Sequence, residues 1–369
     1  MTNTATSHQD RLTRMGGVLR DADVDLLLVA PSADLRYLIG YGARPSERPA
    51  LLAVMPAAPP LMLLPALEAP RLANLDIVRV VPYGETEDPI ARLADSLLGL
   101  PVASRVAISD QSWAGVLLRL QQHFPAATFT PASTLVRNLR MRKDAMEIAL
   151  LTDAGAKADR AFGEFVQLRF SGRTERELAR ELQRLLDSQG LETAEWGPSV
   201  ASGPNSSSPH HITGNREIHE GDAVILDFGG QIDTYQADIT RTVHVGTPDH
   251  EFVQVYNIVR RAQQAGVEAA RIGSIAESVD RATRAIIDEA GYGDYFIHRT
   301  GHGVGLDVHE EPYMVQGNAL PLDPGMVFSV EPGIYLPGKF GVRVEDIVMT
   351  TEDEPVRLNN ATRDLVIVH

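Results

Sequence analysis

The chain has 369 residues, of which 44% are hydrophobic and 22% are charged, which is the balance of an ordinary soluble globular protein long enough for two domains. Its formal net charge of −15 argues against a nucleic-acid partner, because phosphate binding needs clustered Lys and Arg. The chain contains no cysteine, so disulfides and thiolate ligands are excluded, and any metal must be held by oxygen and imidazole.

The N-terminal stretch MTNTATSHQDRLTRMGG is polar and lacks the apolar core of a signal peptide. No uncharged apolar run long enough to span a membrane follows it. We therefore expect a cytoplasmic protein without a membrane partner.

The region from residue 10 to about residue 137 alternates helical and strand patterns, which predicts a small α/β domain with a mixed sheet. It contains no phosphate loop or glycine-rich dinucleotide fingerprint. Its only candidate site residues are Arg44 and Arg48, in a loop over residues 43–49. The expected helices are 11–21, 66–72 (a short turn), 88–98 and 113–123, and the expected strands are 25–29, 50–55, 61–64, 77–81 and 106–108.

A basic cluster at residues 137–143 marks the expected domain boundary, which gives domains 1–137 and 138–369. A long helix is expected from Asp144, and Thr174 with Glu177 has capping-box spacing for a helix that runs to Ser188. Further helices are expected at 251–270 and 274–290, before a second set of strands. This order of helices followed by strands occurs twice and hints at internal pseudo-symmetry.

The stretch AVILDFGGQIDTYQADITRTVHVG predicts a hairpin with strands at 223–228 and 237–245, and each strand carries one aspartate, Asp227 or Asp238. A carboxylate in a buried strand is costly unless a cation compensates it, and two side by side repel each other. A bound metal would remove that conflict. The alternative is a structural pair, with one aspartate bonded to Arg241 and the other to backbone amides.

The second set of strands carries three further candidates. His302 lies between glycines in GHGVG, where the absence of side chains allows a ligand or backbone to approach closely. Glu331 lies in the apolar stretch SVEPGIY, and Glu345 lies in GVRVEDIVMT, where alternation would put Arg343, Glu345 and Ile347 on one face of a strand. Four carboxylates and one imidazole form a hard ligand set suited to a pair of divalent metals.

The strings DFGG, ADITRT, GHGVG, EPGIY and VRVED resemble the metal-binding motifs of the creatinase-fold ("pita-bread") metallopeptidases. This family includes Xaa-Pro dipeptidases, aminopeptidases P and methionine aminopeptidases, and the likeness covers roughly residues 140–369. It implies an α+β pita-bread catalytic domain after the α/β N-terminal domain. Methionine aminopeptidases resemble only the second half, so the N-terminal domain favours the proline peptidases.

The resemblance also implies roles for the matched residues. Asp227 would bind one metal and could chelate it through both oxygens, Asp238 and Glu345 would bridge, and His302 and Glu331 would complete the second site. Mn²⁺ is the preferred metal, and Zn²⁺ and Co²⁺ are alternatives. Glu331 would accept a proton from the attacking water and pass it to the leaving nitrogen.

Further residues are implied around the metals. His210 in SSSPHHITG and His309 in LDVHEEP would bind substrate or stabilise the tetrahedral intermediate. Thr240 and Arg343 would orient the ligand carboxylates. Tyr235 falls near a substrate-contacting tyrosine of relatives, although tyrosine in a strand more often packs. The remaining histidines 211, 219, 244 and 298 are expected to be structural or exposed.

The implied reaction is hydrolysis of Xaa-Pro dipeptides (prolidase activity), with aminopeptidase P as the alternative. A dipeptidase must bind the proline carboxylate, most naturally through arginine. Some dipeptidases of the family carry that arginine between the GHG histidine and the EPG glutamate, yet residues 310–330 contain no Arg or Lys. Our candidates are Arg44 and Arg48, which could reach across a homodimer, and then Arg343.

Two other classes remain: a creatinase-like hydrolase without metals, and a non-catalytic pita-bread binding protein. Five intact ligands argue against the first. The second would be expected to lose ligands or gain basic extensions, and neither change is present in the sequence.

Overall fold

The structure is a computed structural model that describes residues 2–98, 104–194 and 197–369. The chain divides into two compact units, Met1–Arg140 and Met141–His369, which are described separately below. Within the described residues, no helix has the length and apolar character needed to cross a membrane.

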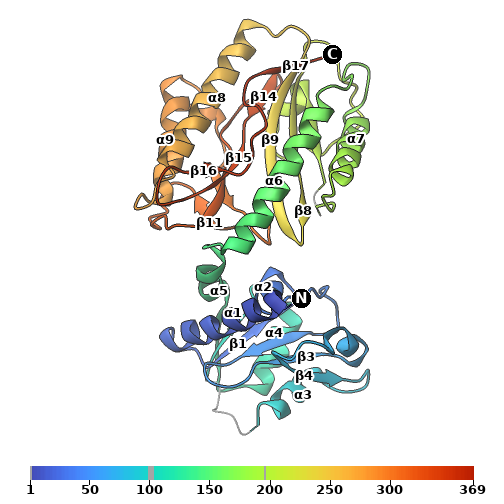
Figure 1. Ribbon diagram of the computed structural model, residues 1–369, viewed down its shortest axis with the longest axis vertical. Helices are drawn as coiled ribbons and strands as arrows, with labels where there is room; N and C mark the ends of the chain where they lie inside the picture. Colours follow the sequence, from blue (N-terminus) through green and yellow to red (C-terminus); the bar gives the residue numbers. More distant parts are fainter. Residues whose placement is uncertain (1, 99–103, 195–196) are drawn as a thin grey trace. The chain divides into compact units, whose positions relative to one another are not determined.

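The N-terminal unit is built on a six-stranded sheet in the order β4-β3-β2-β1-β5-β6 (Figure 1). Strand β1 pairs antiparallel with β2 and parallel with β5, so the sheet is mixed, as predicted. Its inner strands are apolar along their whole length, which is typical of strands covered on both faces. The strands are β1 (Leu26–Val29), β2 (Leu51–Val54), β3 (Leu61–Pro65), β4 (Arg79–Tyr83), β5 (Arg105–Ile108) and β6 (Thr128–Pro131).

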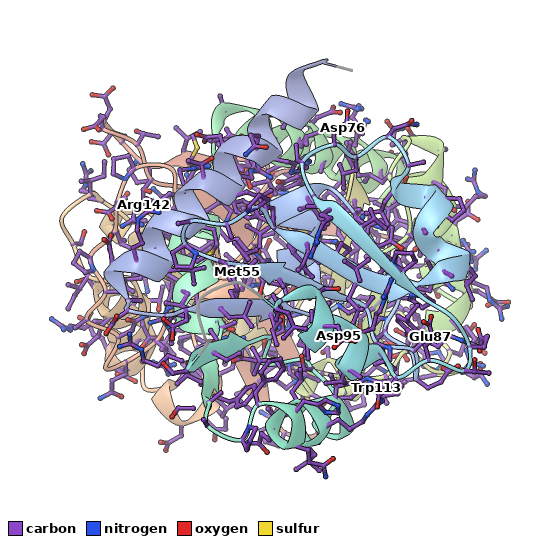
Figure 2. The ribbon with its side chains drawn as sticks, turned by 90° about the horizontal axis from the view of Figure 1, so that it is seen from below. Met55, Asp76, Glu87, Asp95, Trp113 and Arg142 are labelled. Carbon is purple, nitrogen blue, oxygen red and sulfur yellow. The ribbon has the colours of Figure 1, made fainter. Side chains whose placement is uncertain are left out.

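The expected helices of this unit are present with shifted ends, and two further helices occur. The first helix begins at Thr2, well before the expected start at Arg11, and the helix expected at 113–123 begins after Trp113, which is half exposed (Figure 2). Helices α2 and α5 and strand β6 were not predicted. Strand β6 is a short, largely exposed edge strand without apolar alternation. The helices are α1 (Thr2–Asp21), α2 (Ala33–Ile39), η1 (Ala66–Leu72), α3 (Pro89–Ser96), α4 (Ala114–His123) and α5 (Ser133–Arg140).

The C-terminal unit begins with two capped helices, α6 (Ala145–Phe165) and α7 (Glu175–Ser188). Asp144 caps α6, and Thr174 and Glu177 form the predicted capping box of α7. The two helices bury their apolar faces against a four-stranded sheet, and Figure 1 shows α6 crossing β8 and β9. The sheet order is β17-β9-β8-β7, with β7 (Ser199–Ser202), β8 (Ala223–Ile232), β9 (Tyr235–Val245) and β17 (Val366–Val368).

The central hairpin is longer than predicted. Residues 229–232 and 235–236 pair within the ladder, so only Asp233 and Thr234 form the turn. Both residues have positive φ, 46° and 70°, which is the two-residue turn geometry that matches the twist of an antiparallel hairpin. The polar residues that suggested a wide loop are therefore part of the strands.

The second half of this unit repeats the order of helices followed by strands. Helices α8 (His250–Ala269) and α9 (Ala276–Glu289) pack side by side (Figure 1). They precede a five-stranded sheet, β11-β10-β12-β15-β16, and a two-stranded ribbon, β13-β14. These strands are β10 (Gly301–Gly303), β11 (Glu310–Met314), β12 (Val327–Val330), β13 (Gly333–Leu336), β14 (Phe340–Arg343), β15 (Asp346–Met349) and β16 (Val356–Arg357); η2 (Gly203–Ser207) and η3 (Gly293–Tyr295) are short turns.

The glycines beside His302 are required by backbone packing. A Cβ on Gly301 would lie 1.8 Å from the carbonyl oxygen of Ser329, and one on Gly303 would lie 2.3 Å from that of Glu311. Strand β10 is thus held between β11 and β12 at a separation that side chains on these residues would prevent. The sequence predicted that a ligand or backbone approaches these glycines closely, and the structure shows that neighbouring backbone does so.

The prediction that Glu331 and Glu345 lie within strands is wrong. Glu331 lies between β12 and β13, and Glu345 lies between β14 and β15. At Glu331 the chain passes from the five-stranded sheet to the two-stranded ribbon, and at Glu345 it returns to the five-stranded sheet. A break in the ladder frees each glutamate from the strict alternation of a strand, although Arg343 and Glu345 line the same cavity.

Candidate active site

The C-terminal unit contains a cavity of about 560 Å³ whose wall is rich in charged and imidazole side chains. It is formed where the hairpin β8-β9 faces the second set of strands. The residues predicted from sequence that line it are His210, Asp227, Asp238, His302, His309, Glu331, Arg343 and Glu345, and the wall also includes Pro209, His298, Arg299 and Val308.

The hairpin positions the two aspartates diagonally on one face. In the ladder Asp227 pairs with Thr240, and Asp238 pairs with Gly229 two residues along. Because directly paired residues point to the same side of a sheet and the side alternates along each strand, both carboxylates face the cavity. Asp238 is only 5% exposed.

The second set of strands contributes an imidazole and a carboxylate in contact. His302 Nε2 lies 3.1 Å from Glu331 Oε1 and 3.8 Å from Asp238 Oδ2. Ser329 fixes both partners, because its hydroxyl donates to Glu331 Oε1 at 3.1 Å and accepts the backbone N–H of His302 at 3.0 Å. This contact connects a ligand candidate on β10 to the end of β12.

Hydrogen bonds between the two sets of strands hold Glu345 at the hairpin. Its backbone N–H donates to Thr240 O at 3.1 Å, and the Thr240 hydroxyl donates to Glu345 Oε2 at 2.7 Å. Arg343 donates to the same hydroxyl through Nε at 3.0 Å and to Asp227 Oδ2 through Nη2 at 2.6 Å. Thr240 and Arg343 therefore fix the orientation of two cavity carboxylates.

The acidic residues in this cavity lack sufficient positive charge among the described protein groups. Glu345 is 2% exposed, and its Oε1 has no hydrogen-bond partner in the part of the chain that the structure describes. Burial raises the pKa of Glu345 well above its ordinary value, and the negative charge of Glu331 adds to the shift. Burial likewise raises the pKa of Asp238, followed by the charge of Glu345.

This pattern fits a divalent cation. Asp238, His302 and Glu345 can each offer one ligand atom, and these three atoms lie within 4.8 Å of one another. Oxygen and imidazole donors suit a hard or borderline metal. A cation there would partner the unbonded Glu345 oxygen and offset the repulsion that raises the two pKa values, so the residues present fit the metal that the sequence implied.

The pKa values of Glu331 and His309 are both lowered, whereas those of the other cavity acids are raised. Burial raises the pKa of Glu331, but the hydrogen bond and charge of His302 outweigh it and lower the pKa to about 2. Desolvation on the cavity wall and the neighbouring His302, whose ring centroid is 4.0 Å away, lower the pKa of His309 to about 4. At neutral pH Glu331 is therefore ionised and His309 is a neutral hydrogen-bond donor.

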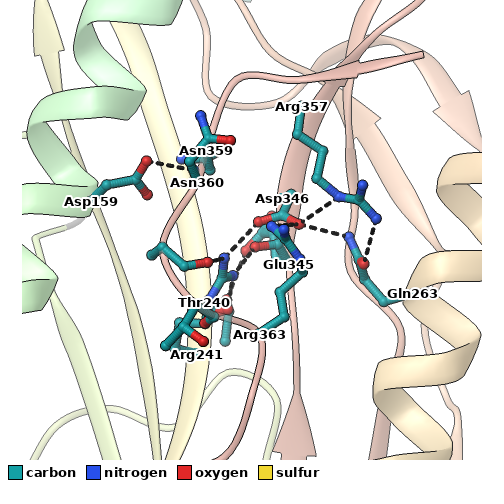
Figure 3. A network of polar contacts seen from close by, with 12 residues as sticks. Asp159, Thr240, Arg241, Gln263, Glu345, Asp346, Arg357, Asn359, Asn360 and Arg363 are labelled. Atoms are coloured by element: carbon teal, nitrogen blue, oxygen red, sulfur yellow. Dashed lines mark hydrogen bonds and ion pairs between the residues drawn. The ribbon is translucent and has the colours of Figure 1, made fainter. Parts of the chain in front are cut away.

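The alternative prediction, in which Arg241 bonds one of the hairpin aspartates, is wrong. Arg241 does not bond Asp227 or Asp238; its Nη2 donates to Asp346 at 2.7 Å (Figure 3). Asp346 also accepts from Arg357, Arg363 and Gln263, each at 3.1 Å. Arg343 is the arginine that pairs with Asp227.

Three residues proposed for substrate binding lie elsewhere. Tyr235 is 5% exposed and packs in an apolar cluster, and its hydroxyl lies 2.9 Å from Glu147 Oε1, so it has the packing role that was its alternative. Arg44 and Arg48 line a different cavity within the N-terminal unit. Arg48 is ion-paired there with Glu85 at 3.1 Å.

The cavity wall also contains residues that the sequence analysis did not assign to it. His298 was expected to be structural or exposed, yet it lines the cavity and its Nε2 lies 2.9 Å from the hydroxyl of Tyr335. Arg299 lies next to it and was not singled out, although both residues belong to the string HRTGHG that contains His302. Proximity in sequence to the ligand histidine was the available signal.

The other histidines have structural contacts. His211 Nε2 lies 2.8 Å from Glu175 Oε2, and His244 Nδ1 lies 2.9 Å from the carbonyl oxygen of Gly246. His219 is exposed and lies 3.9 Å from Glu217. These contacts agree with the expectation of structural or surface roles.

Comparison with known proteins identifies the family. Residues 149–352 match the model of metallopeptidase family M24, and residues 11–142 match the Creatinase/Prolidase N-terminal domain. The chain belongs to metallopeptidase family M24. It is therefore a metal-dependent peptidase with a creatinase-type N-terminal domain and a pita-bread domain, which confirms the fold and enzyme class expected from the sequence.

Relatives within family M24 cover nearly the whole chain. A protein named probable dipeptidase PepE from Mycobacterium tuberculosis is 41% identical over 97% of this chain and 96% of its own length. The Xaa-Pro dipeptidase of Lactobacillus helveticus is 37% identical over 95% of this chain and 96% of that protein. Among solved structures, a recombinant prolidase from Thermococcus sibiricus superposes with a TM-score of 0.93 at 37% identity, over 97% of this chain and 98% of that one.

Proposed function

We propose that this M24 metallopeptidase hydrolyses the Xaa-Pro bond of dipeptides, using two divalent metal ions held by Asp227, Asp238, His302, Glu331 and Glu345. The observation that carries the proposal is the cavity in which these five side chains converge and in which the buried Glu345 Oε1 has no hydrogen-bond partner among the described residues. The names of two full-length relatives, Xaa-Pro dipeptidase and prolidase, support the substrate class.

The ligand set favours Mn²⁺, with Zn²⁺ and Co²⁺ as alternatives, because four carboxylates and one imidazole are hard to borderline donors. Asp227 would contribute mainly through the oxygen that Arg343 leaves free, since Oδ2 already accepts a bond of 2.6 Å. The chemistry that such ions supply when bound is activation of a water molecule and polarisation of the scissile carbonyl.

The protein's own groups then manage protons and substrate. Glu331 is ionised at neutral pH, so it can accept the proton of the attacking water and pass it to the leaving imide nitrogen. His309 is neutral, so its N–H can donate to the developing oxyanion without adding positive charge beside the metals. His210, also exposed on the cavity wall, would donate to the peptide backbone.

We assign this chemistry to domain 138–369, and we propose that domain 1–137 accompanies it in a homodimer. Light scattering coupled to size-exclusion chromatography tests the oligomeric state directly. A monomeric mass would remove the dimer from the proposal without affecting the metal centre, because the lining of the cavity described above belongs to one chain.

The test of the activity is Mn²⁺-supplemented hydrolysis of a Xaa-Pro dipeptide and of a Xaa-Pro-Xaa tripeptide, with metal content measured in parallel. We expect cleavage of the dipeptide and its loss in Glu331→Gln, which removes the proton acceptor. Cleavage of the tripeptide instead would indicate an aminopeptidase P. Metal-loaded protein that cleaves neither peptide would refute the proline-peptidase assignment and favour a binding protein.

A further inference from the structure

We propose that Arg299 binds the C-terminal carboxylate of the dipeptide and makes the enzyme selective for dipeptides over longer or amidated peptides. This inference rests on the proposed Xaa-Pro peptidase function. It assigns a specificity role to a residue outside the predicted site, in place of Arg44, Arg48 and Arg343.

The cavity wall carries two arginines with contrasting surroundings. Arg343 is 4% exposed, and its guanidinium is committed to Asp227, Thr240 and the hydroxyl of Tyr335. Arg299 is partly exposed, and within the described part of the chain no carboxylate lies at ion-pair distance from its guanidinium. Arg299 is therefore the wall cation that can accept a new anion without breaking an existing pair.

An aromatic ring holds this guanidinium in place. The Cζ of Arg299 lies 4.2 Å from the ring centroid of Tyr313 on β11, a cation–π distance. A guanidinium held over a ring by a cation–π contact keeps N–H donors available for an anion. A planar fork of donors with free edges is the group that binds a carboxylate through two parallel hydrogen bonds.

The stacking also explains how the cation can remain unpaired beside an acidic site. The wall contains four carboxylates, and a flexible lysine or arginine would be drawn onto them. Tyr313 restrains Arg299, while the metal ions would neutralise the acids. The positive charge still reaches the site, because it contributes, after burial and His302, to the lowered pKa of His309.

Tyr313 lies in the segment of the sequence that lacks the arginine found in some dipeptidases of the family. Residues 310–330 contain no Arg or Lys, so the segment in which some dipeptidases of the family carry the carboxylate-binding arginine has none here. Tyr313 in that segment instead supports an arginine from the chain just before β10. The cationic group is therefore supplied from a different segment, the chain that leads into β10.

The experiment compares wild type with Arg299→Met on a Xaa-Pro dipeptide and on the same dipeptide with an amidated C-terminus. Loss of charge-assisted hydrogen bonds should lower kcat/KM for the free dipeptide by about 10–100-fold, mainly through KM, with little change for the amide. Metal content should not change. Arg281→Met, on the exposed face of α9, is the matched control and should behave as wild type.

Arg299→Lys separates charge from geometry, since lysine keeps the charge but not the planar fork. It should recover part of the activity on the dipeptide. An equal loss on dipeptide and amide in Arg299→Met, or no loss on either, overturns the proposal while leaving the Xaa-Pro peptidase function intact.

A binding measurement makes the test independent of turnover. Calorimetry of Mn²⁺-supplemented protein with L-proline and with L-prolinamide should show a preference for proline in wild type that disappears in Arg299→Met. If wild type cleaves no peptide but shows this pattern, the proposed function fails and the carboxylate site stands. If wild type shows no preference for proline, the carboxylate site is refuted.

Discussion

Glu345 and Asp346 are neighbours in the sequence and both are buried, but their carboxylates have different numbers of hydrogen-bond partners. Asp346 is completely inaccessible and accepts bonds from three arginines and one glutamine (Figure 3). Glu345 has one oxygen bonded to Thr240 and the other to nothing among the described residues. Burying a charge is expensive in both places, but among the described residues Asp346 has three ion pairs with arginine and Glu345 has none.

This difference separates Asp346, whose contacts are structural, from Glu345, which we propose binds a metal ion. The Asp346 cluster also supports its neighbour, because Arg241 Nη1 donates to the backbone carbonyl of Glu345 as well as Nη2 to Asp346. The Asp346 cluster therefore helps to hold the backbone of Glu345, the residue that we propose as a metal ligand. Substitutions at the two positions should consequently affect different properties of the enzyme.

Glu345→Gln should have the largest effect on catalysis. Loss of a ligand charge should lower kcat/KM by about 10³-fold, equivalent to several kcal/mol of transition-state stabilisation, and should lower the metal content measured by elemental analysis. Glu352→Gln, at a nearby exposed carboxylate, is the control. Retention of full activity and metal would show that Glu345 is not a ligand.

Asp346→Asn should have the largest effect on stability. Three arginines would lose their shared anion in the interior, which should cost about 3–5 kcal/mol, and the protein should melt about 10 °C lower. Thermal unfolding of metal-free protein measures this cost without interference from ligand binding. A melting temperature within a degree of wild type would contradict the structural role of the cluster.

Thr240→Val should have an intermediate effect on metal affinity. The hydroxyl links Arg343 to Glu345, so its loss frees both side chains from their orientation. Removal of such a supporting hydrogen bond should weaken metal binding by about 10–100-fold. Competition with a fluorescent chelator measures the affinity, and Thr152→Val on the exposed face of α6 should leave it unchanged.

The smallest effect is the pH dependence of metal-free stability. The folded-state pKa of Glu345 is raised above that of the unfolded chain, mainly by burial, so its contribution to stability is fully present at low pH and is lost as pH rises through the folded pKa. In metal-free Glu345→Gln the glutamine does not titrate, so this position causes no loss of stability as the pH rises. Its stability relative to wild type should therefore be similar near pH 5 and increase towards pH 8.

One titrating group limits this change to about 1.4 kcal/mol per pH unit. Denaturant unfolding of both metal-free proteins at several pH values checks it. A variant that is less stable than wild type at pH 8 would show that the Glu345 charge is compensated by the protein after all. Metal-loaded wild type should show the opposite trend, because the ligands must be deprotonated to bind.

The sequence by itself determined the elements whose signals are local. The hairpin with Asp227 and Asp238 follows from apolar runs around a polar turn, and α7 follows from the capping box at Thr174. The strings around His302, Glu331 and Glu345 pointed to the M24 family because such motifs are short and contiguous. The mixed N-terminal sheet was recoverable for the same reason, apart from its exposed edge strand.

Only the tertiary structure decided which charges meet. Alternation along one strand put Glu345 on a face with Ile347, but a change of sheet interrupts the ladder there. Arg343 pairs with Asp227, and Arg241 pairs with Asp346, although each pair is more than a hundred residues apart in the chain. Such pairings depend on how strands pack across the unit, as does the stacking of Arg299 on Tyr313, and no local pattern encodes them.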